Sequence, residues 1–126
     1  LIRSRGLGDV YKRQSMWRAC RLVVDTGIHA FNWSREKAVN YLSDNTALSI
    51  HEINTEIDRY ISWPGQALSY KIGELKIKEL RSKSEELLSS RFDIHDFHEA
   101  ILKNGTITLP MMEKQVENYI NSKLSN

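Results

Sequence analysis

The helical spacing of the apolar residues, which continues from the sixteenth residue to the end of the chain, constrains the fold most strongly. No segment alternates apolar and polar residues as a half-buried strand would. Ser34, Asp93 and Ser49 (with an acid three residues on) suit helix starts, and Asn104-Gly105 suits a helix end. The sequence therefore predicts an all-α fold of about six helices, over residues 16–31, 34–42, 49–62, 65–90, 93–104 and 110–124. The third of these has an apolar face formed by Ile50, Ile53, Ile57 and Ile61.

The helix predicted over residues 16–31 carries an ionisable stripe on an otherwise apolar surface. Arg18, Arg21, Asp25 and His29 are three, four and four residues apart, which places them on one face. Ionisable groups on a buried helix need a partner or a wet cavity, because desolvating a charge is costly. Two interpretations stay open: a structural Arg21–Asp25 ion pair with His29 satisfied nearby, or a polar ridge that lines a cleft.

A second notable stretch is YISWPGQALSYKIG, residues 60–73. Pro64 suits the first turn of the helix that follows. Gly73 inside that helix costs about 1 kcal/mol relative to alanine, which suggests the close approach of another backbone or a ligand. The hydroxyl of Tyr70 would need a partner if it were buried. The alternative is a core helix with two apolar faces.

The cysteine and histidine residues do not indicate a metal site. Cys20 is alone and lies in an apolar helical stretch, so it is interpreted as a small buried apolar residue. His51-Glu52 begins like the zinc motif HExxH, but Thr55 stands where the second histidine is needed. His95 and His98 lack a third ligand. We therefore predict no metal ligand in this chain.

Residues 1–14 differ from everything that follows. Residues 4–14, SRGLGDVYKRQ, match letter for letter the translation of a transposase-type sequencing adapter, and residues 1–3 adjoin them. We therefore expect residues 1–14 to be a non-native addition, and residues 15–126 to be the native part, whose true N-terminus and cellular location are unknown.

The charge balance changes when that segment is set aside. Residues 1–14 hold four basic residues (Arg3, Arg5, Lys12 and Arg13) and one acidic residue, which leaves 14 basic and 15 acidic residues in the rest. The electrostatic case for binding nucleic acid or an anionic membrane then disappears. No apolar run is long enough to span a bilayer. A basic nucleic-acid-binding arm remains the interpretation if residues 1–14 are native.

Four stretches of residues 16–120 resemble a bacterial family catalogued as domain of unknown function 885. They are MWRACRLVVDTGIHAFNWSREKAVNYL, NTALS, DRYISWPGQALSYKIGELKIKELR and FDIHDFHEAILKNGTITLP, and the most specific marks are RLVVDTGIH and WPGQALSYKIG. Asn32 stands where the pattern leads us to expect glycine. The family is similar to zincin-type metallopeptidases, and its zinc motif and a later zinc-binding glutamate are expected upstream of Met16.

The resemblance implies that this chain is the C-terminal helical part of a larger domain that hydrolyses peptides with a zinc-activated water. Zinc would belong to the parent and not to this fragment, which would be inactive alone. The implied partners are the missing N-terminal part of the same chain and a peptide, and a freestanding helical protein-interaction module is the alternative. The cleft-wall candidates are Tyr70 and His29 on the oxyanion or substrate side, and Arg21, Asp25, Tyr60 and Gln66 for substrate binding.

Overall fold

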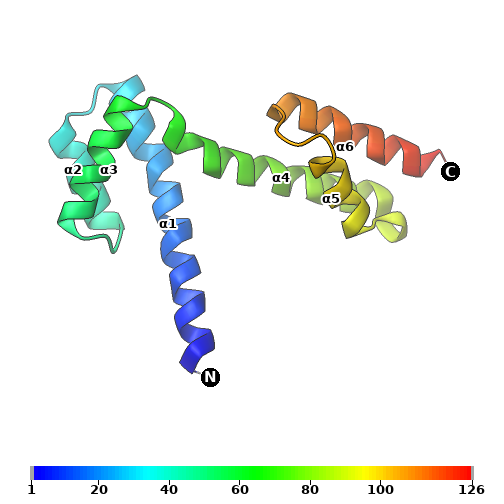
Figure 1. Ribbon diagram of the computed structural model, residues 1–126, viewed down its shortest axis with the longest axis horizontal. Helices are drawn as coiled ribbons and strands as arrows, with labels where there is room; N and C mark the ends of the chain where they lie inside the picture. The colour runs from blue at the N-terminus through cyan, green and yellow to red at the C-terminus, as the bar shows by residue number, and fades with distance from the viewer. Residues whose placement is uncertain (1, 126) are drawn as a thin grey trace. The chain divides into compact units, whose positions relative to one another are not determined.

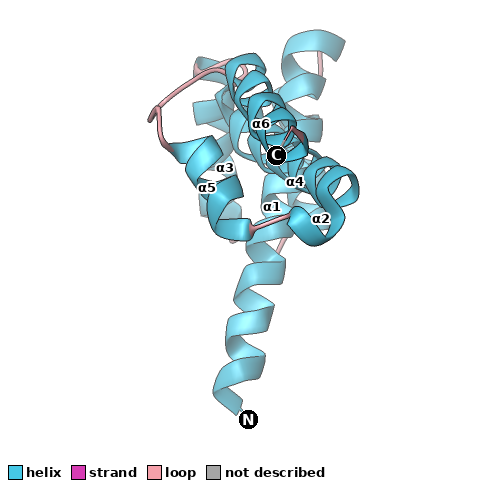
Figure 2. Ribbon diagram, turned by 90° about the vertical axis from the view of Figure 1, so that its right-hand side faces the viewer, coloured by secondary structure: helices cyan, strands magenta, loops and turns pink. Residues whose placement is uncertain are grey.

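The computed structural model describes residues 2–125, with side chains from Gly8 onward. The described chain is all-α, with six α-helices, one short 3-10 turn and no strand, which confirms the predicted fold class (Figures 1 and 2). None of the helices in the described part is long and apolar enough to cross a membrane. In chain order the elements are α1 (Ile2–Phe31), α2 (Arg35–Asn45), α3 (Ile50–Ser62), α4 (Gln66–Leu88), η1 (Ser89–Arg91), α5 (Ile94–Leu102) and α6 (Leu109–Leu124).

Three of the predicted helix starts, at Ser34, Ser49 and Asp93, are confirmed by their hydrogen bonds. Ser34 caps α2 by accepting from the backbone N–H of Lys37 at 3.1 Å. Ser49 and Glu52 form both halves of a capping box at α3, with the Ser49 N–H donating to Glu52 at 2.9 Å. Asp93 accepts from the N–H groups of His95 and Asp96, the second and third residues of α5. These caps satisfy donors that would otherwise lack partners at a helix N-terminus.

Helix α1 begins much earlier than the predicted Met16. Its first turns reach Ile2, although residues 8–16 are all exposed. Extending a helix that already exists adds one hydrogen bond per residue and needs no new nucleus, so tertiary contacts are not required for this extension. The expectation that residues 1–14 are non-native remains a prediction.

The chain divides into two compact units, residues 1–72 and 73–126, and the boundary lies within α4. The first unit packs α1, α2 and α3 together with the start of α4, as Figure 1 shows for the three helices. Its fully buried side chains include Val24, Leu42, Ile53 and Ile57. The second unit packs the rest of α4 with α5 and α6 around a core of Leu80, Leu88, Phe97, Met112, Val116 and Ile120.

The predicted apolar face of α3 is correct only at its centre. Ile53 and Ile57 are fully buried, but Ile50 is 59% and Ile61 is 41% exposed. Tyr60 is buried in place of Ile61, because Ile53, Ile57 and Tyr60 at i, i+4 and i+7 share one narrow face of α3. Ile50 lies in the exposed first turn. Pro64 also lies outside the predicted position, since α4 begins only at Gln66.

Two glycines have opposite surroundings. A Cβ at the buried Gly27 would lie 2.5 Å from the ring of Trp33, whose backbone N–H donates to the Gly27 carbonyl at 2.9 Å. A Cβ at Gly73 would meet nothing within 4 Å. No described residue makes the close approach suggested at Gly73, and such an approach occurs at Gly27 instead.

The pair gives a matched test of packing. Gly27→Ala should lower the free energy of unfolding by about 1–3 kcal/mol because Trp33 must move, whereas Gly73→Ala should raise it by up to about 1 kcal/mol. Urea unfolding followed by far-ultraviolet circular dichroism measures both changes. Equal effects of the two substitutions would contradict the packing described at Gly27.

Candidate functional site

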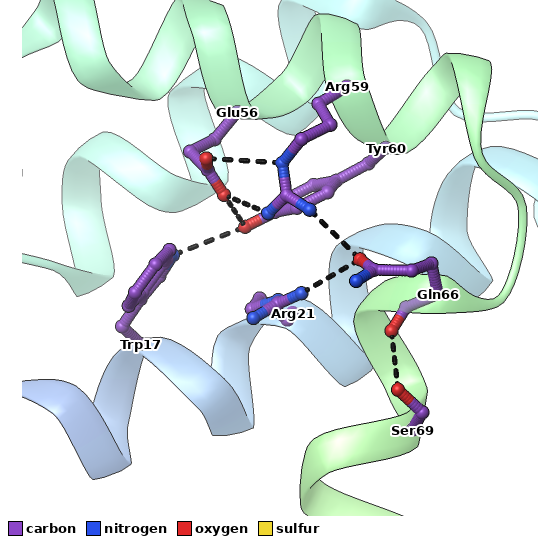
Figure 3. A network of polar contacts seen from close by, with 7 residues as sticks. All are labelled: Trp17, Arg21, Glu56, Arg59, Tyr60, Gln66 and Ser69. Atoms are coloured by element: carbon purple, nitrogen blue, oxygen red, sulfur yellow. Dashed lines mark hydrogen bonds and ion pairs between the residues drawn. The ribbon is translucent and has the colours of Figure 1, made fainter.

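The six residues predicted from the sequence as site candidates meet at one corner of the first unit. Helix α1 contributes Arg21, Asp25 and His29, and the last turn of α3 contributes Tyr60. The first two turns of α4 contribute Gln66 and Tyr70. Each of the six contacts another member or the turn between α3 and α4. Figure 3 shows part of this cluster.

The Arg21 guanidinium lies at the centre of the corner. The residue is only 4% exposed, and its Cζ lies 5.4 Å from the ring centroids of Trp17 and Tyr60 and 5.1 Å from that of Tyr70. Its Nη2 donates to Oε1 of Gln66 at 3.2 Å, and its buried Nε has no hydrogen-bond partner in the described chain. The aromatic faces stabilise the cation without neutralising it.

Asp25 binds the turn between α3 and α4 instead of Arg21. Its carboxylate accepts the backbone N–H of Gly65 at 3.1 and 3.2 Å, and the residue is 2% exposed. Gly65 has a φ of 80°, a left-handed conformation that glycine adopts without strain. The Arg21–Asp25 ion pair considered from the sequence is therefore not formed, because each residue has a partner on another element.

Glu56 and Arg59 of α3 belong to the same cluster and were not predicted. Oε2 of Glu56 lies 2.6 Å from Nη2 of Arg59 and accepts the Tyr60 hydroxyl at 2.7 Å, as Figure 3 shows. The Tyr60 hydroxyl accepts from Nε1 of Trp17 at 3.2 Å. Both bonding positions of the hydroxyl are thus occupied. The only signal in the sequence was the spacing of Glu56, Arg59 and Tyr60 at i, i+3 and i+4.

The electrostatics of the cluster keep Tyr60 neutral and Glu56 charged. Burial, the hydrogen bond to Glu56 and the charge of Glu56 raise the pKa of Tyr60, and the Arg21 charge opposes this. Burial acts to raise the pKa of Glu56. The hydrogen bonds from Arg59 and Tyr60 and the charges of Arg59 and Arg21 outweigh it, so this pKa is lowered. The Tyr60 hydroxyl therefore keeps its proton near neutral pH and donates it in the hydrogen bond to Glu56.

His29 and Tyr70, the two residues predicted to lie on the oxyanion or substrate side, are the exposed members of the six. His29 is exposed, and its Nε2 lies 2.9 Å from the carbonyl oxygen of Tyr60. A carbonyl only accepts, so Nε2 carries the hydrogen and Nδ1 is left as the possible acceptor. Tyr70 is 55% exposed, and its ring contacts the Arg21 cation. The corner thus combines buried charged groups with two exposed side chains able to form hydrogen bonds.

The corner has no metal site of its own. Within the described part of the chain, no three His, Cys, Asp or Glu side chains are grouped so that they could hold a metal ion. A cavity of about 360 Å³ borders the cluster, and its lining includes Trp17 and Glu56 but none of the six predicted residues.

The lowered pKa of Glu56 predicts a pH dependence of stability. A carboxylate whose pKa is lower in the folded chain stabilises the fold above its unfolded pKa of about 4.3. That contribution is lost as the pH falls through the folded pKa. Glu56→Gln should therefore lower the free energy of unfolding by about 1–3 kcal/mol at pH 7, and the difference from the unchanged chain should vanish at low pH.

Urea unfolding between pH 7 and pH 3 measures this difference. Glu86→Gln is the matched control, because Glu86 is exposed on α4 in the second unit and lies outside the cluster. The cluster would not depend on the Glu56 charge if the two variants had the same pH profile.

Comparisons with known proteins place the chain in a family. Residues 9–116 match the family described as "Bacterial protein of unknown function (DUF885)". The crystal structure of a "putative lipoprotein" from Colwellia psychrerythraea is similar, with 40% sequence identity and a TM-score of 0.85 over 87% of this chain. This chain spans only 19% of that protein. No curated protein sequence matches. Since the matched residues include most of α1, all of α2 to α5, the first half of α6 and both marks RLVVDTGIH and WPGQALSYKIG, the chain belongs to the DUF885 family.

Proposed function

We propose that this chain is the C-terminal, substrate-binding wall of a larger zinc-dependent peptidase and is inactive alone. The observation that carries the proposal is the convergence of Arg21, Tyr60, Gln66 and Tyr70 from three helices on one corner. Guanidinium and phenol groups suit the binding of a peptide carbonyl and of the negative charge that develops on it. The similarity to a protein about five times as long supports the proposal that this chain is one part of a larger protein.

In this proposal the exposed and buried residues have different tasks. Tyr70 and His29 face the substrate and donate or accept hydrogen bonds there. Asp25 and Tyr60 hold the corner together and do not touch the reacting atoms. Arg21 binds the peptide beside the scissile bond, and Gln66 occupies the guanidinium until the peptide arrives.

The family resemblance implies that the zinc ligands lie upstream of Met16, and no three His, Cys, Asp or Glu side chains of the described residues are grouped to hold a metal ion. When bound there, zinc would supply an activated water. We assign no reaction step to a metal ligand of this chain.

Apolar side chains exposed on α1 and α4 support the idea that another polypeptide segment packs against these helices. Phe31 on α1 is 69% exposed, and Ile72, Leu75 and Ile77 on α4 are 42%, 50% and 39% exposed. Under the proposal the missing part of the same chain covers these side chains. Under the alternative, a freestanding interaction module, they bind a helix of another protein.

Expression of residues 15–126 alone distinguishes these two functions. We expect the isolated segment to self-associate and to bind a hydrophobic dye, because its exposed apolar surface lacks its cover. Size-exclusion chromatography and dye binding measure this. A monodisperse monomer that unfolds cooperatively would favour the interaction module.

The catalytic role is tested in the complete protein, obtained by reading the native frame upstream of Met16 from the source DNA. We expect zinc-dependent peptide hydrolysis, and we expect Tyr70→Phe to lower kcat by about 100-fold to 1,000-fold, as loss of an oxyanion donor does. Tyr41→Phe is the control, since Tyr41 lies on α2 against Trp33 and away from the corner. Failure of the complete protein to hydrolyse any peptide would refute the proposal.

A further inference from the structure

Two guanidinium groups share a single neutral acceptor at the corner. Oε1 of Gln66 accepts from Nη2 of Arg21 at 3.2 Å and from Nη1 of Arg59 at 2.9 Å, and Figure 3 shows both groups directed at it. A position between two cations is where a carboxylate oxygen would receive two charge-assisted hydrogen bonds. The amide oxygen of Gln66 is a weaker acceptor at the same place.

The charges of the cluster are unevenly paired. Arg59 has its own carboxylate, because Glu56 binds it through both oxygens at 2.6 and 3.3 Å. Asp25 is already bound to the N–H of Gly65. Arg21 has no carboxylate within ion-pair distance among the described residues, although it is 4% exposed and its Nε is unsatisfied. A buried cation without a counter-ion is unfavourable unless a ligand supplies one.

The three rings around Arg21 differ in exposure and in the bonds that hold them. Trp17 and Tyr60 are joined by a hydrogen bond, and Tyr60 is also held by Glu56. Tyr70 is the exposed ring of the three, and a change of its side-chain rotamer would uncover the guanidinium from the solvent side.

We infer that Arg21 is the receptor for a carboxylate of the substrate, which replaces the Gln66 oxygen between the two guanidinium groups. The inference rests on the proposed function, because it specifies the substrate class of that wall: peptides with a free C-terminal carboxylate or an acidic side chain next to the scissile bond.

The test uses the complete protein and a small probe. Isothermal titration calorimetry should show binding of N-acetylglycine and no binding of N-acetylglycinamide, which lacks the carboxylate. Arg21→Met should abolish this binding and raise the melting temperature, because an unpaired buried cation is replaced by an apolar side chain of similar length. Arg18→Met, a change in the same helix outside the cluster, should leave the binding intact.

A second variant keeps the test decisive if Arg21→Met does not fold. Gln66→Ala removes the competing acceptor and should strengthen N-acetylglycine binding several-fold. Weaker or unchanged binding by Gln66→Ala would overturn the inference. So would a lower melting temperature of Arg21→Met, since it would show that the rings and Gln66 already satisfy the guanidinium.

Assays of peptide hydrolysis distinguish the carboxylate site from the proposed peptidase function. They also distinguish a C-terminal carboxylate from an acidic side chain as the group bound. A preference for free over amidated C-termini indicates a terminal carboxylate, and a preference for glutamate in amidated peptides indicates a side chain. Hydrolysis without either preference would refute the inference and leave the proposed function standing. Arg21-dependent binding of N-acetylglycine without hydrolysis of any peptide would refute the proposed peptidase function and leave the carboxylate site standing.

Discussion

The bond between the Asp25 carboxylate and the Gly65 N–H is the interaction on which the rest of the corner depends. It holds the turn between α3 and α4 against α1, and that turn determines where α4 begins. Gln66 follows Gly65 directly and Tyr70 lies one turn later, so both reach Arg21 only while this turn is in place. Both oxygens of the buried Asp25 carboxylate share this single N–H, which compensates part of the cost of burial. The left-handed φ of Gly65 presents the N–H without backbone strain.

The local features of the fold were predictable because their causes are local. The caps at Ser34, Ser49 and Asp93 depend on residues within three positions, and the sequence shows these directly. The partner of Asp25 was not predictable in the same way. Spacing along one helix offers only a partner on that helix, whereas the N–H of Gly65 is distant in sequence and carries no side chain that could mark it.

The sequence predicted the members of the candidate site that its patterns mark and missed those that resemble ordinary surface residues. The stripe on α1 and the block around Gln66 are visible in the sequence, and the structure brings them together. Glu56 and Arg59 were missed because an acid and a base three apart on a helix usually form a solvated pair. At Asn32 the structure explains an expectation that came only from the family resemblance. Asn32 has a φ of 53°, a left-handed backbone conformation that glycine adopts most easily, and glycine is the residue expected there.

The position of the unit boundary within α4 has a spectroscopic consequence. The three tryptophans, Trp17, Trp33 and Trp63, all belong to residues 1–72, and the unit of residues 73–126 has none. Indole fluorescence therefore reports on the first unit alone, whereas the helical signal sums both units. Noncoincident unfolding curves from the two signals would reveal independent melting of the units, and the ring of Trp33 over Gly27 would serve as the intrinsic reporter for one of them.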